Sequence, residues 1–315
     1  MTAPETPALA LVHVRKSFGK TAAVADVSFD VTPGEMFGVI GPDGAGKTTT
    51  LRMICGLLKR DAGDIRLFGA DPWTKRDVAT SSIGYLSQRF SLYGDLSIDE
   101  NIAFFARAHN VRDFDQRRAR LLTLTGLEPF RTRLAEKLSG GMKQKLALAC
   151  TLVHQPRMLV LDEPTTGVDP VSRREFWKLV AEFLSEGLTI VLATPYLDEA
   201  ERCARVVLLS DGRVLALDAP SALQKAGQGI VLEVVVTPPR VALAALRREL
   251  GDDAVQLFGD RLHVHVSSLD AEAQIVSRLT TAGCHVAQVR RILPSLEDVF
   301  IERLALSRRA EGVVA

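Results

Sequence analysis

Short apolar runs alternate with amphipathic helical segments along the first two thirds of the chain. The runs are mostly aliphatic, as expected for parallel strands that are buried on both faces of a sheet. The predicted strands are residues 9–14, 24–31, 36–40, 158–162 and 188–193. Helical periodicity follows at residues 49–58 and 170–185. This alternation predicts an α/β domain at residues 8–228.

A helical insert interrupts the α/β pattern at about residues 89–155. Its first helix is expected to begin after Ser97, because Glu100 stands three residues later and completes a capping box. The arginines between Arg112 and Arg133 either face solvent or contact a partner or lipid, and a solvated face is the commoner outcome. Later in the chain, the pair Asp211-Gly212 predicts the turn of a hairpin.

The rhythm of the sequence changes near residues 228–229, which predicts a second domain at residues 229–306. Its elements are expected in the order strand, helix, strand, strand, helix, strand, an order that is typical of a small ferredoxin-like α+β domain. The predicted elements are residues 230–237, 239–250, 254–258, 261–266, 269–282 and 285–293. A last helix is expected to begin at Ser295, which acts as its cap.

Three histidines of this second domain fall on neighbouring predicted strands. His263 and His265 alternate onto one face of a strand, and His285 begins another strand. A three-histidine metal site is one interpretation of this arrangement. Exposed strand histidines that bind no metal are the commoner alternative.

Composition and charge exclude several classes of protein. The chain of 315 residues has 39 Lys+Arg against 38 Asp+Glu, so its net charge of +1 creates no field that favours nucleic acid or an anionic membrane. No run approaches the roughly 18 apolar residues of a membrane span, and residues 1–7 lack the apolar core of a signal peptide. A cytoplasmic location is therefore expected. The four cysteines stand far apart, which predicts reduced thiols.

Residues 41–48, with the sequence GPDGAGKT, fit the Gly-x4-Gly-Lys-Ser/Thr pattern between a predicted strand and a predicted helix. Glycines let backbone N–H groups approach polyphosphate oxygens, and the N-terminus of the helix adds positive potential. Lys47 is expected to reach the β and γ phosphates, and Thr48 is expected to bind Mg²⁺. The predicted nucleotide-binding residues here are Gly41, Pro42, Asp43, Gly44, Ala45, Gly46, Lys47, Thr48 and Thr49.

Two adjacent acids stand at the end of the predicted strand 158–162. In a P-loop protein, the strand beside the phosphate loop carries an aspartate that orders the water shell of the metal, and Asp162 fits this role. Glu163 is then placed to accept a proton from an attacking water. An isolated Asp-Glu pair at a strand end would more often be a solvated turn, so this prediction depends on the phosphate loop.

A third motif, LSGGMKQK at residues 138–145, precedes Asp162 by one short predicted helix. It resembles the signature motif of ATP-binding cassette (ABC) ATPases. Physically, Ser139, Gly140 and Gly141 form a helix start, and therefore a second phosphate-binding surface on one chain. The resemblance implies a head-to-tail dimer in which this surface closes over nucleotide held by a second cassette, either another copy or a related chain.

Other positions match the same family. Phe18 resembles the aromatic residue that stacks on adenine, although an isolated phenylalanine there would more often be part of the core. Gln88 resembles the glutamine that touches the metal and hinges the helical insert. Residues 167–170, GVDP, resemble the loop that crosses the dimer interface, and Asp169-Pro170 is equally a helix start. The tail PSLEDVF, at residues 294–300, resembles the C-terminal segment of ABC-2 type exporter ATPases.

Two positions depart from the pattern of the family. Asp43 stands where Asn or Ser is more usual, and its carboxylate is expected to point away from the polyphosphate, toward the dimer interface. Residues 194–196 read Thr-Pro-Tyr where the family has Thr-His-Tyr. Pro195 has neither a side-chain donor nor an N–H, so it cannot hydrogen-bond the γ phosphate. We expect ATP hydrolysis to persist, either slowly or without need of that contact.

The resemblance implies an ATP-binding and hydrolysing subunit that powers an ABC-2 type exporter. The implied catalytic residues are Glu163, Lys47 and Gln88, and the implied Mg²⁺ ligands are Thr48, Gln88 and Asp162. The implied partners are a second cassette and an integral-membrane permease, which would hold the chain on the inner face of the membrane; no nucleic acid is expected. Three alternatives stay open: a soluble ABC protein acting on the ribosome or nucleic acid, an importer subunit, and an ATP-gated regulator with little or no hydrolysis.

Overall fold

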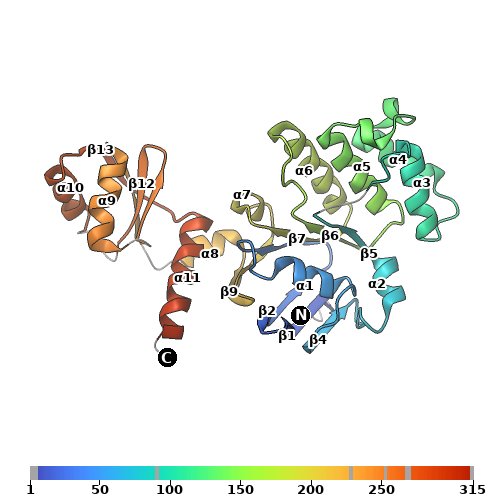
Figure 1. Cartoon of the computed structure of the whole chain (residues 1–315), viewed down its shortest axis with the longest axis horizontal. Helices are drawn as coiled ribbons and strands as arrows, with labels where there is room; N and C mark the ends of the chain where they lie inside the picture. The colour runs from blue at the N-terminus through green and yellow to red at the C-terminus, as the bar shows by residue number, and fades with distance from the viewer. Residues whose placement is uncertain (1–5, 89–91, 227–229, 252–253, 267–270, 313–315) are drawn as a thin grey trace, which may run out of the picture. The chain divides into compact units, whose positions relative to one another are not determined.

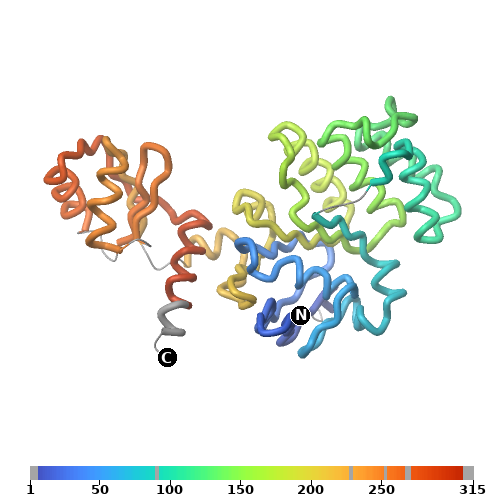
Figure 2. The backbone as a smooth tube through the Cα atoms, in the orientation of Figure 1, coloured from blue at the N-terminus to red at the C-terminus, as the bar shows by residue number. Residues whose placement is uncertain are grey.

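The computed structural model describes residues 6–88, 92–226, 230–251, 254–266 and 271–312. The chain divides into two compact units, Met1–Leu217 and Asp218–Ala315, each with its own sheet (Figure 1). Figure 2 traces the backbone through both units. The predicted boundary at residues 228–229 lies outside the described residues. Helix α8 (Pro220–Ala226) belongs to the second unit, where it packs against the last helix, α11 (Leu296–Gly312).

A nine-stranded sheet in the order β4-β1-β2-β9-β8-β3-β7-β6-β5 forms the first unit. The run from β8 to β5 is parallel, whereas β1 pairs antiparallel with β2 and β4. Every residue of β3, β6 and β7 is buried, which is why apolar runs predicted these strands. The strands are β1 (Leu9–Phe18), β2 (Thr21–Val31), β3 (Met36–Ile40), β4 (Ala62–Leu67), β5 (Ile83–Leu86), β6 (Met158–Asp162), β7 (Thr189–Thr194), β8 (Arg205–Ser210) and β9 (Arg213–Asp218).

Three helices in the predicted insert, α3, α4 and α5, gather beside the β5 edge of this sheet (Figure 1). The insert was predicted to begin at residue 89, and residues 89–91 lie outside the described ranges. The helices of the first unit are α1 (Lys47–Ile54), α2 (Arg76–Ser82), α3 (Ile98–Ala108), α4 (Asp115–Thr125), α5 (Gly140–Leu152), α6 (Pro170–Ser185) and α7 (Leu197–Ala200), with 3-10 turns at Glu128–Phe130 and Ala135–Lys137.

Side-chain caps confirm three predicted helix starts in this unit. Ser97 and Glu100 form the complete capping box of α3. Ser139 caps α5, and Asp169 caps α6 by accepting hydrogen bonds from two backbone N–H groups. The second and third caps matter for function, because they fix the start of the signature helix and the loop that precedes α6.

Some elements of the first unit differ from the prediction. Helix α1 ends at Ile54 rather than residue 58, because the chain turns at Gly56, where φ is +67°. Strand β4 was not predicted, since only Ile65 and Leu67 of its six residues are buried. Helix α2 and strand β5 were also missed, and both are too short to display a clear period.

A buried carboxylate ties α6 to the strand that leads into the candidate site. Glu199 is 0 % exposed and accepts hydrogen bonds from the hydroxyls of Thr165 and Thr194. It also pairs with Arg173, whose Nη2 lies 3.0 Å from Glu199 Oε1. A buried carboxylate is tolerated only where hydrogen bonds and a cation compensate for its lost hydration. The network therefore fixes the segment that follows β7.

Replacing Arg173 by methionine should lower the free energy of unfolding by about 2 kcal/mol, because Glu199 loses its cation and keeps only hydroxyl donors. The estimate is smaller than for a fully buried pair, since 27 % of the Arg173 side chain is exposed. Urea unfolding of the full chain measures the change. Arg174→Met, at an exposed position of the same helix, is the matched control, and equal stability of the two variants would contradict the prediction.

The second unit has an antiparallel four-stranded sheet in the order β11-β12-β10-β13. Its elements follow the order predicted from the sequence, although residues 269–270 of the predicted second helix lie outside the described ranges. They are β10 (Ile230–Thr237), α9 (Pro239–Leu250), β11 (Val255–Phe258), β12 (Arg261–Val266), α10 (Ala271–Thr281) and β13 (His285–Ile292). Across the described residues of both units, no helix combines the length and hydrophobicity that crossing a membrane requires.

The start of α11 lies against the histidine-bearing face of this sheet. Ser295 Oγ accepts from the backbone N–H of Asp298 at 3.1 Å, and Asp298 Oδ2 accepts from the backbone N–H of Ser295 at 2.7 Å, which confirms Ser295 as the cap. Burial tends to raise the pKa of Asp298, but hydrogen bonds from His265 and Ser295 outweigh it and lower that pKa to about 2. Asp298 therefore anchors the helix as a carboxylate.

The three-histidine metal interpretation is wrong. His263 and His265 do share a face, but His285 lies opposite Thr237, about 13 Å along β10 from the residue opposite His263. The two neighbouring histidines lie instead beside the carboxylate of Asp298, at 3.5 and 3.2 Å. Within the described ranges, no cluster of three or more His, Cys, Asp or Glu side chains is suited to a metal ion.

Candidate nucleotide-binding site

The segment between β3 and α1 forms a loop that only glycine permits at several positions. Gly44 and Gly46 have φ values of +82° and +97°, in the left-handed region. A Cβ atom at Gly46 or Gly41 would lie 2.4 or 2.3 Å from a backbone carbonyl oxygen. Helix α1 begins at the next residue, Lys47, and no side chain of the described residues caps it. Its first N–H groups are therefore free to bind an anion.

Lys47 is almost completely buried under this loop, with 4 % of its side chain exposed. Its Nζ donates to the carbonyl oxygens of Gly41 at 2.8 Å and Pro42 at 3.0 Å. It also lies 3.4 Å from Glu163 Oε1. The ammonium group thus sits at the centre of the loop, between backbone acceptors and an acid, where phosphate oxygens can replace these partners.

Asp162 ends β6 and is 1 % exposed. Thr48 Oγ1 donates to its Oδ1 at 3.0 Å, and the hydroxyl of Tyr85 donates to its Oδ2 at 3.0 Å. Burial raises the pKa of Asp162, and the two hydrogen bonds oppose that rise. In the sheet, β7 lies between β3 and β6, and the Thr48 side chain spans the gap between the phosphate loop and Asp162.

Glu163 follows Asp162 in an unusual backbone conformation, with φ of +49°. Such a conformation costs a residue with a side chain about 1–3 kcal/mol and persists only where surrounding contacts impose it. The backbone N–H of Glu163 donates to the carbonyl of Ala193 at 2.8 Å, and Gln88 Nε2 donates to Glu163 Oε2 at 3.0 Å. The carboxylate is therefore held in one orientation above the phosphate loop.

These groups surround a cavity of about 570 Å³. The phosphate-loop part of its lining is Asp43, Gly44, Gly46, Lys47, Thr48 and Thr49, and the rest is Phe18, Ala23, Gln88, Glu163, Thr166, Pro195 and Tyr196. Phe18 is 52 % exposed, so it is not a core residue, and Lys16 Nζ lies over its ring, 5.5 Å from the ring centre. Four other predicted residues, Gly41, Pro42, Ala45 and Asp162, do not line the cavity but support residues that do.

Asp43 meets the expectation only in part. Its side chain is 95 % exposed, as expected for a carboxylate that avoids a polyphosphate. Its Oδ1 nevertheless lies 4.0 Å from Lys47 Nζ, and it contributes to the cavity lining. It therefore remains close enough to weaken the positive potential of the loop.

Four charges determine which ligand the cavity accepts. Asp43, Asp162 and Glu163 outnumber Lys47, so a bare polyphosphate would be repelled and a cation is needed to accompany it. The candidate donors for that cation are the Thr48 hydroxyl, an Asp162 carboxylate oxygen and the Gln88 amide. Hard oxygen donors of this kind suit Mg²⁺.

The signature residues, which the sequence assigned to a second phosphate-binding surface, do not line this cavity. Ser139 and Gly140 are exposed at the start of α5. A Cβ atom at Gly140 would meet nothing within 4 Å, whereas one at Gly141 would lie 2.1 Å from Ser172 Oγ. Gly141 is therefore needed for packing against α6, while Gly140 presents bare backbone to solvent.

Tyr85 is a site residue that the sequence analysis did not identify. It lies on β5, which pairs in parallel with β6, and its hydroxyl holds Asp162 in place. A tyrosine inside a short apolar strand is the available signal, because a buried Tyr hydroxyl usually requires a polar partner. The partner itself could not be named, since the pairing of β5 with β6 is a tertiary feature.

Comparison with known proteins places this geometry in a family. The family model described as "ABC transporter" matches residues 24–166. The probable multidrug ABC transporter ATP-binding protein YbhF of Escherichia coli is 48% identical over 92% of this chain and 50% of its own length, so the chain spans about half of that relative. The Nod factor export ATP-binding protein I of Paraburkholderia xenovorans is 39% identical over 91% of this chain and 94% of its own length.

Solved structures agree with the fold of the first unit. A bacterial ABC transporter cassette with a dimeric structure is 25% identical and superposes with a TM-score of 0.60, covering 67% of this chain and 98% of the other. The match shows that the first unit has the fold of an ABC cassette with a curled mixed sheet.

Proposed function

Because the chain belongs to the ATP-binding proteins of ABC transporters, we propose that it hydrolyses ATP to power an exporter of the ABC-2 type. The observation that carries the proposal is the meeting of Lys47, Thr48, Gln88 and Glu163 around one cavity, with Asp162 behind it. The names of the relatives from Escherichia coli and Paraburkholderia xenovorans, which refer to multidrug transport and Nod factor export, support export as the task.

Each residue of the site has a role in this proposal. The N–H groups of α1 and the ammonium of Lys47 hold the β and γ phosphates, and Phe18 stacks on the base. Glu163 accepts a proton from the attacking water, whose oxygen bonds to the γ phosphorus as the bond to ADP breaks. Thr48, Gln88 and Asp162 would hold Mg²⁺, which would neutralise part of the phosphate charge.

The exposed signature surface supports a head-to-tail dimer of cassettes. A Cβ atom at Gly140 would meet no atom of the described residues within 4 Å, which suits a surface that closes on the nucleotide of a partner cassette. The dimeric structure of a similar cassette is in keeping with this arrangement. We further propose a membrane-embedded permease as the second partner, on the inner face of the membrane, and a ferredoxin-like class for the second unit. Co-purification with a permease from detergent extracts tests the transport part.

A nucleotide-gated regulator with little hydrolysis is the second candidate, and Pro195 is the observation that favours it. Pro195 lines the cavity beside Glu163, at the position where the family has a histidine. The backbone N–H of the next residue, Tyr196, donates to Thr194 Oγ1 at 3.1 Å and is therefore already engaged. The γ phosphate of ATP would therefore have one hydrogen-bond donor fewer here than in a family member with histidine at this position.

Turnover measurements separate the two candidates. The full chain should release phosphate from Mg-ATP above the rate of Lys47→Ala, which lacks the central ammonium group. Pro195→His should raise turnover by up to about a hundredfold, because it adds a donor toward charge that develops on the γ phosphate. Pro195→Ala is the control for loss of the proline ring. A wild-type rate equal to that of Lys47→Ala, with ATP still bound, would establish the regulator instead.

A further inference from the structure

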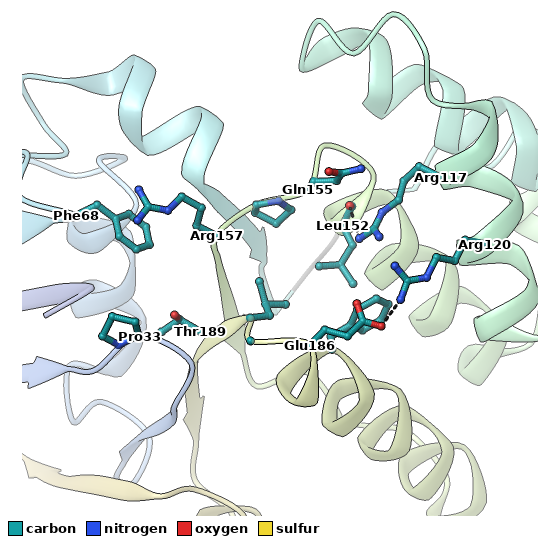
Figure 3. Close-up of a pocket in the computed structure, with 13 residues that line it drawn as sticks. Pro33, Phe68, Arg117, Arg120, Leu152, Gln155, Arg157, Glu186 and Thr189 are labelled. Carbon is teal, nitrogen blue, oxygen red and sulfur yellow. Dashed lines mark hydrogen bonds and ion pairs between the residues drawn. The ribbon is translucent and has the colours of Figure 1, made fainter. Parts of the chain in front are cut away.

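A second cavity of the first unit, of about 450 Å³, lies at the opposite ends of the strands that carry the nucleotide site (Figure 3). Arg157 immediately precedes β6, and Thr189 begins β7. The far end of β7, at Thr194, leads directly into the nucleotide cavity. The five residue steps from Thr189 to Thr194 span about 17 Å at 3.3 Å per residue, so the two cavities are distinct sites.

The lining of this second cavity is strongly basic. It contains Arg117, Arg120 and Arg157 against one carboxylate, Glu186. Arg120 pairs with Glu186, as the dashed line in Figure 3 marks. Among the residues that the structure describes, neither of the other two arginines forms a salt bridge. The lining of the cavity therefore carries more positive than negative charge.

Arg117 is the least satisfied of these cations. Its Nε atom is buried and has no hydrogen-bond partner within the described residues. Its Nη2 makes one long hydrogen bond, 3.5 Å, to the carbonyl of Leu152. Burial lowers the pKa of Arg117, and the charge of Arg120 lowers it further. A guanidinium that has lost hydrating water and lies beside a second guanidinium is stabilised strongly by an anion that contacts both groups.

Apolar side chains complete the cavity and restrict the shape of its ligand. Leu152 and Phe183 line it near Arg117 but are only 1 % and 2 % exposed, so the apolar surface open to a ligand is that of exposed Pro33 and half-buried Leu188. In Figure 3 Arg157 lies on the other side, stacked on Phe68. The guanidinium carbon of Arg157 is 3.7 Å from the centre of that ring. Inorganic anions would leave these apolar surfaces uncovered, whereas an anion with a compact apolar body would bury them.

We propose that this cavity binds a small organic phosphate monoester, with its phosphate held by Arg117 and Arg120 and its apolar part against Pro33 and Leu188. The planar donor arrays of adjacent arginines match phosphate oxygens. The two arginines belong to α4, whereas Arg157 immediately precedes β6 and Thr189 begins β7, so the ligand bridges the helical group and the end of the sheet.

Calorimetric titration of the full chain with phenyl phosphate tests the proposal. We expect one site, with weaker binding of inorganic phosphate, which has no apolar part. Arg117→Gln should lower the affinity for phenyl phosphate by about tenfold or more, as expected for loss of a charge-assisted hydrogen bond, and Arg157→Gln should lower it less. Arg174→Gln, at an exposed position outside the cavity, should leave it unchanged.

The Lys47→Ala variant identifies the site that is occupied. Binding that persists in Lys47→Ala and is lost in Arg117→Gln supports the proposal. The reverse pattern assigns the ligand to the phosphate loop and overturns it, as does a lack of any binding of phenyl phosphate. Thermal unfolding of each variant shows whether it is folded. If Arg117→Gln does not fold, binding of phenyl phosphate by Arg157→Gln, a substitution at an exposed position, is compared with binding by Lys47→Ala instead.

Discussion

Replacing Glu163 by glutamine should slow ATP turnover by about 10²–10⁴-fold while ATP remains bound. The amide has the same shape as the carboxylate, and its oxygen can still accept the hydrogen bond that Gln88 donates at 3.0 Å. It cannot take a proton from water at neutral pH. The substitution also removes a negative charge that lies 3.4 Å from Lys47 Nζ, which lowers the repulsion that a polyphosphate meets in this cavity.

The loss of the proton acceptor and the lowered repulsion of polyphosphate can be measured separately in this variant. Phosphate release measures the loss of the proton acceptor, and size-exclusion chromatography in Mg-ATP measures accumulation of the closed dimer. Glu201→Gln removes an exposed carboxylate from the same chain and should change neither quantity. Wild-type turnover in Glu163→Gln would show that another group accepts the proton. A variant that stays monomeric in saturating Mg-ATP, at high concentration and beside the proposed permease, would contradict the proposed dimer.

The local features of this site could be predicted from the sequence because short-range chemistry determines them. The loop at residues 41–48 requires glycine at fixed positions, and the caps Ser139 and Asp169 act within three residues of themselves. The buried strands β3, β6 and β7 are apolar at nearly every position, so their pattern is independent of their neighbours. Together these features placed the acids and the phosphate loop at one edge of a sheet.

The features that could not be predicted all depend on tertiary pairing. The insertion of β7 between β3 and β6 follows from strand order, which no local pattern encodes. The contact of Tyr85 with Asp162 and the separation of His285 from His263 follow from strand register. The arginines of α4 were expected to face solvent, or a partner or lipid. Only the packed structure places Arg117 and Arg120 in a cavity with Arg157.

Gly140→Asp should abolish turnover without destabilising the chain. A Cβ atom at Gly140 would meet no atom of the described residues within 4 Å, and an acid in the first turn of α5 favours the helix. In the proposed dimer, however, the new carboxylate would face the γ phosphate of the partner cassette and repel it. Gly141→Ala is the contrasting variant, because its Cβ would lie 2.1 Å from Ser172 Oγ and should lower the unfolding temperature.

Mixing Gly140→Asp with Glu163→Gln tests the head-to-tail arrangement directly. Each variant alone is inactive, but a mixed pair has one site in which a normal Glu163 faces a normal signature surface. If the two variants exchange freely and the sites act independently, an equal mixture should recover about a quarter of wild-type turnover, because half of the pairs are mixed and each has one intact site. A tagged pull-down shows whether the two variants have exchanged chains. If the exchanged mixture is still as inactive as each variant alone, the phosphate loop and the signature surface of one site do not come from different chains. The head-to-tail arrangement would then be wrong.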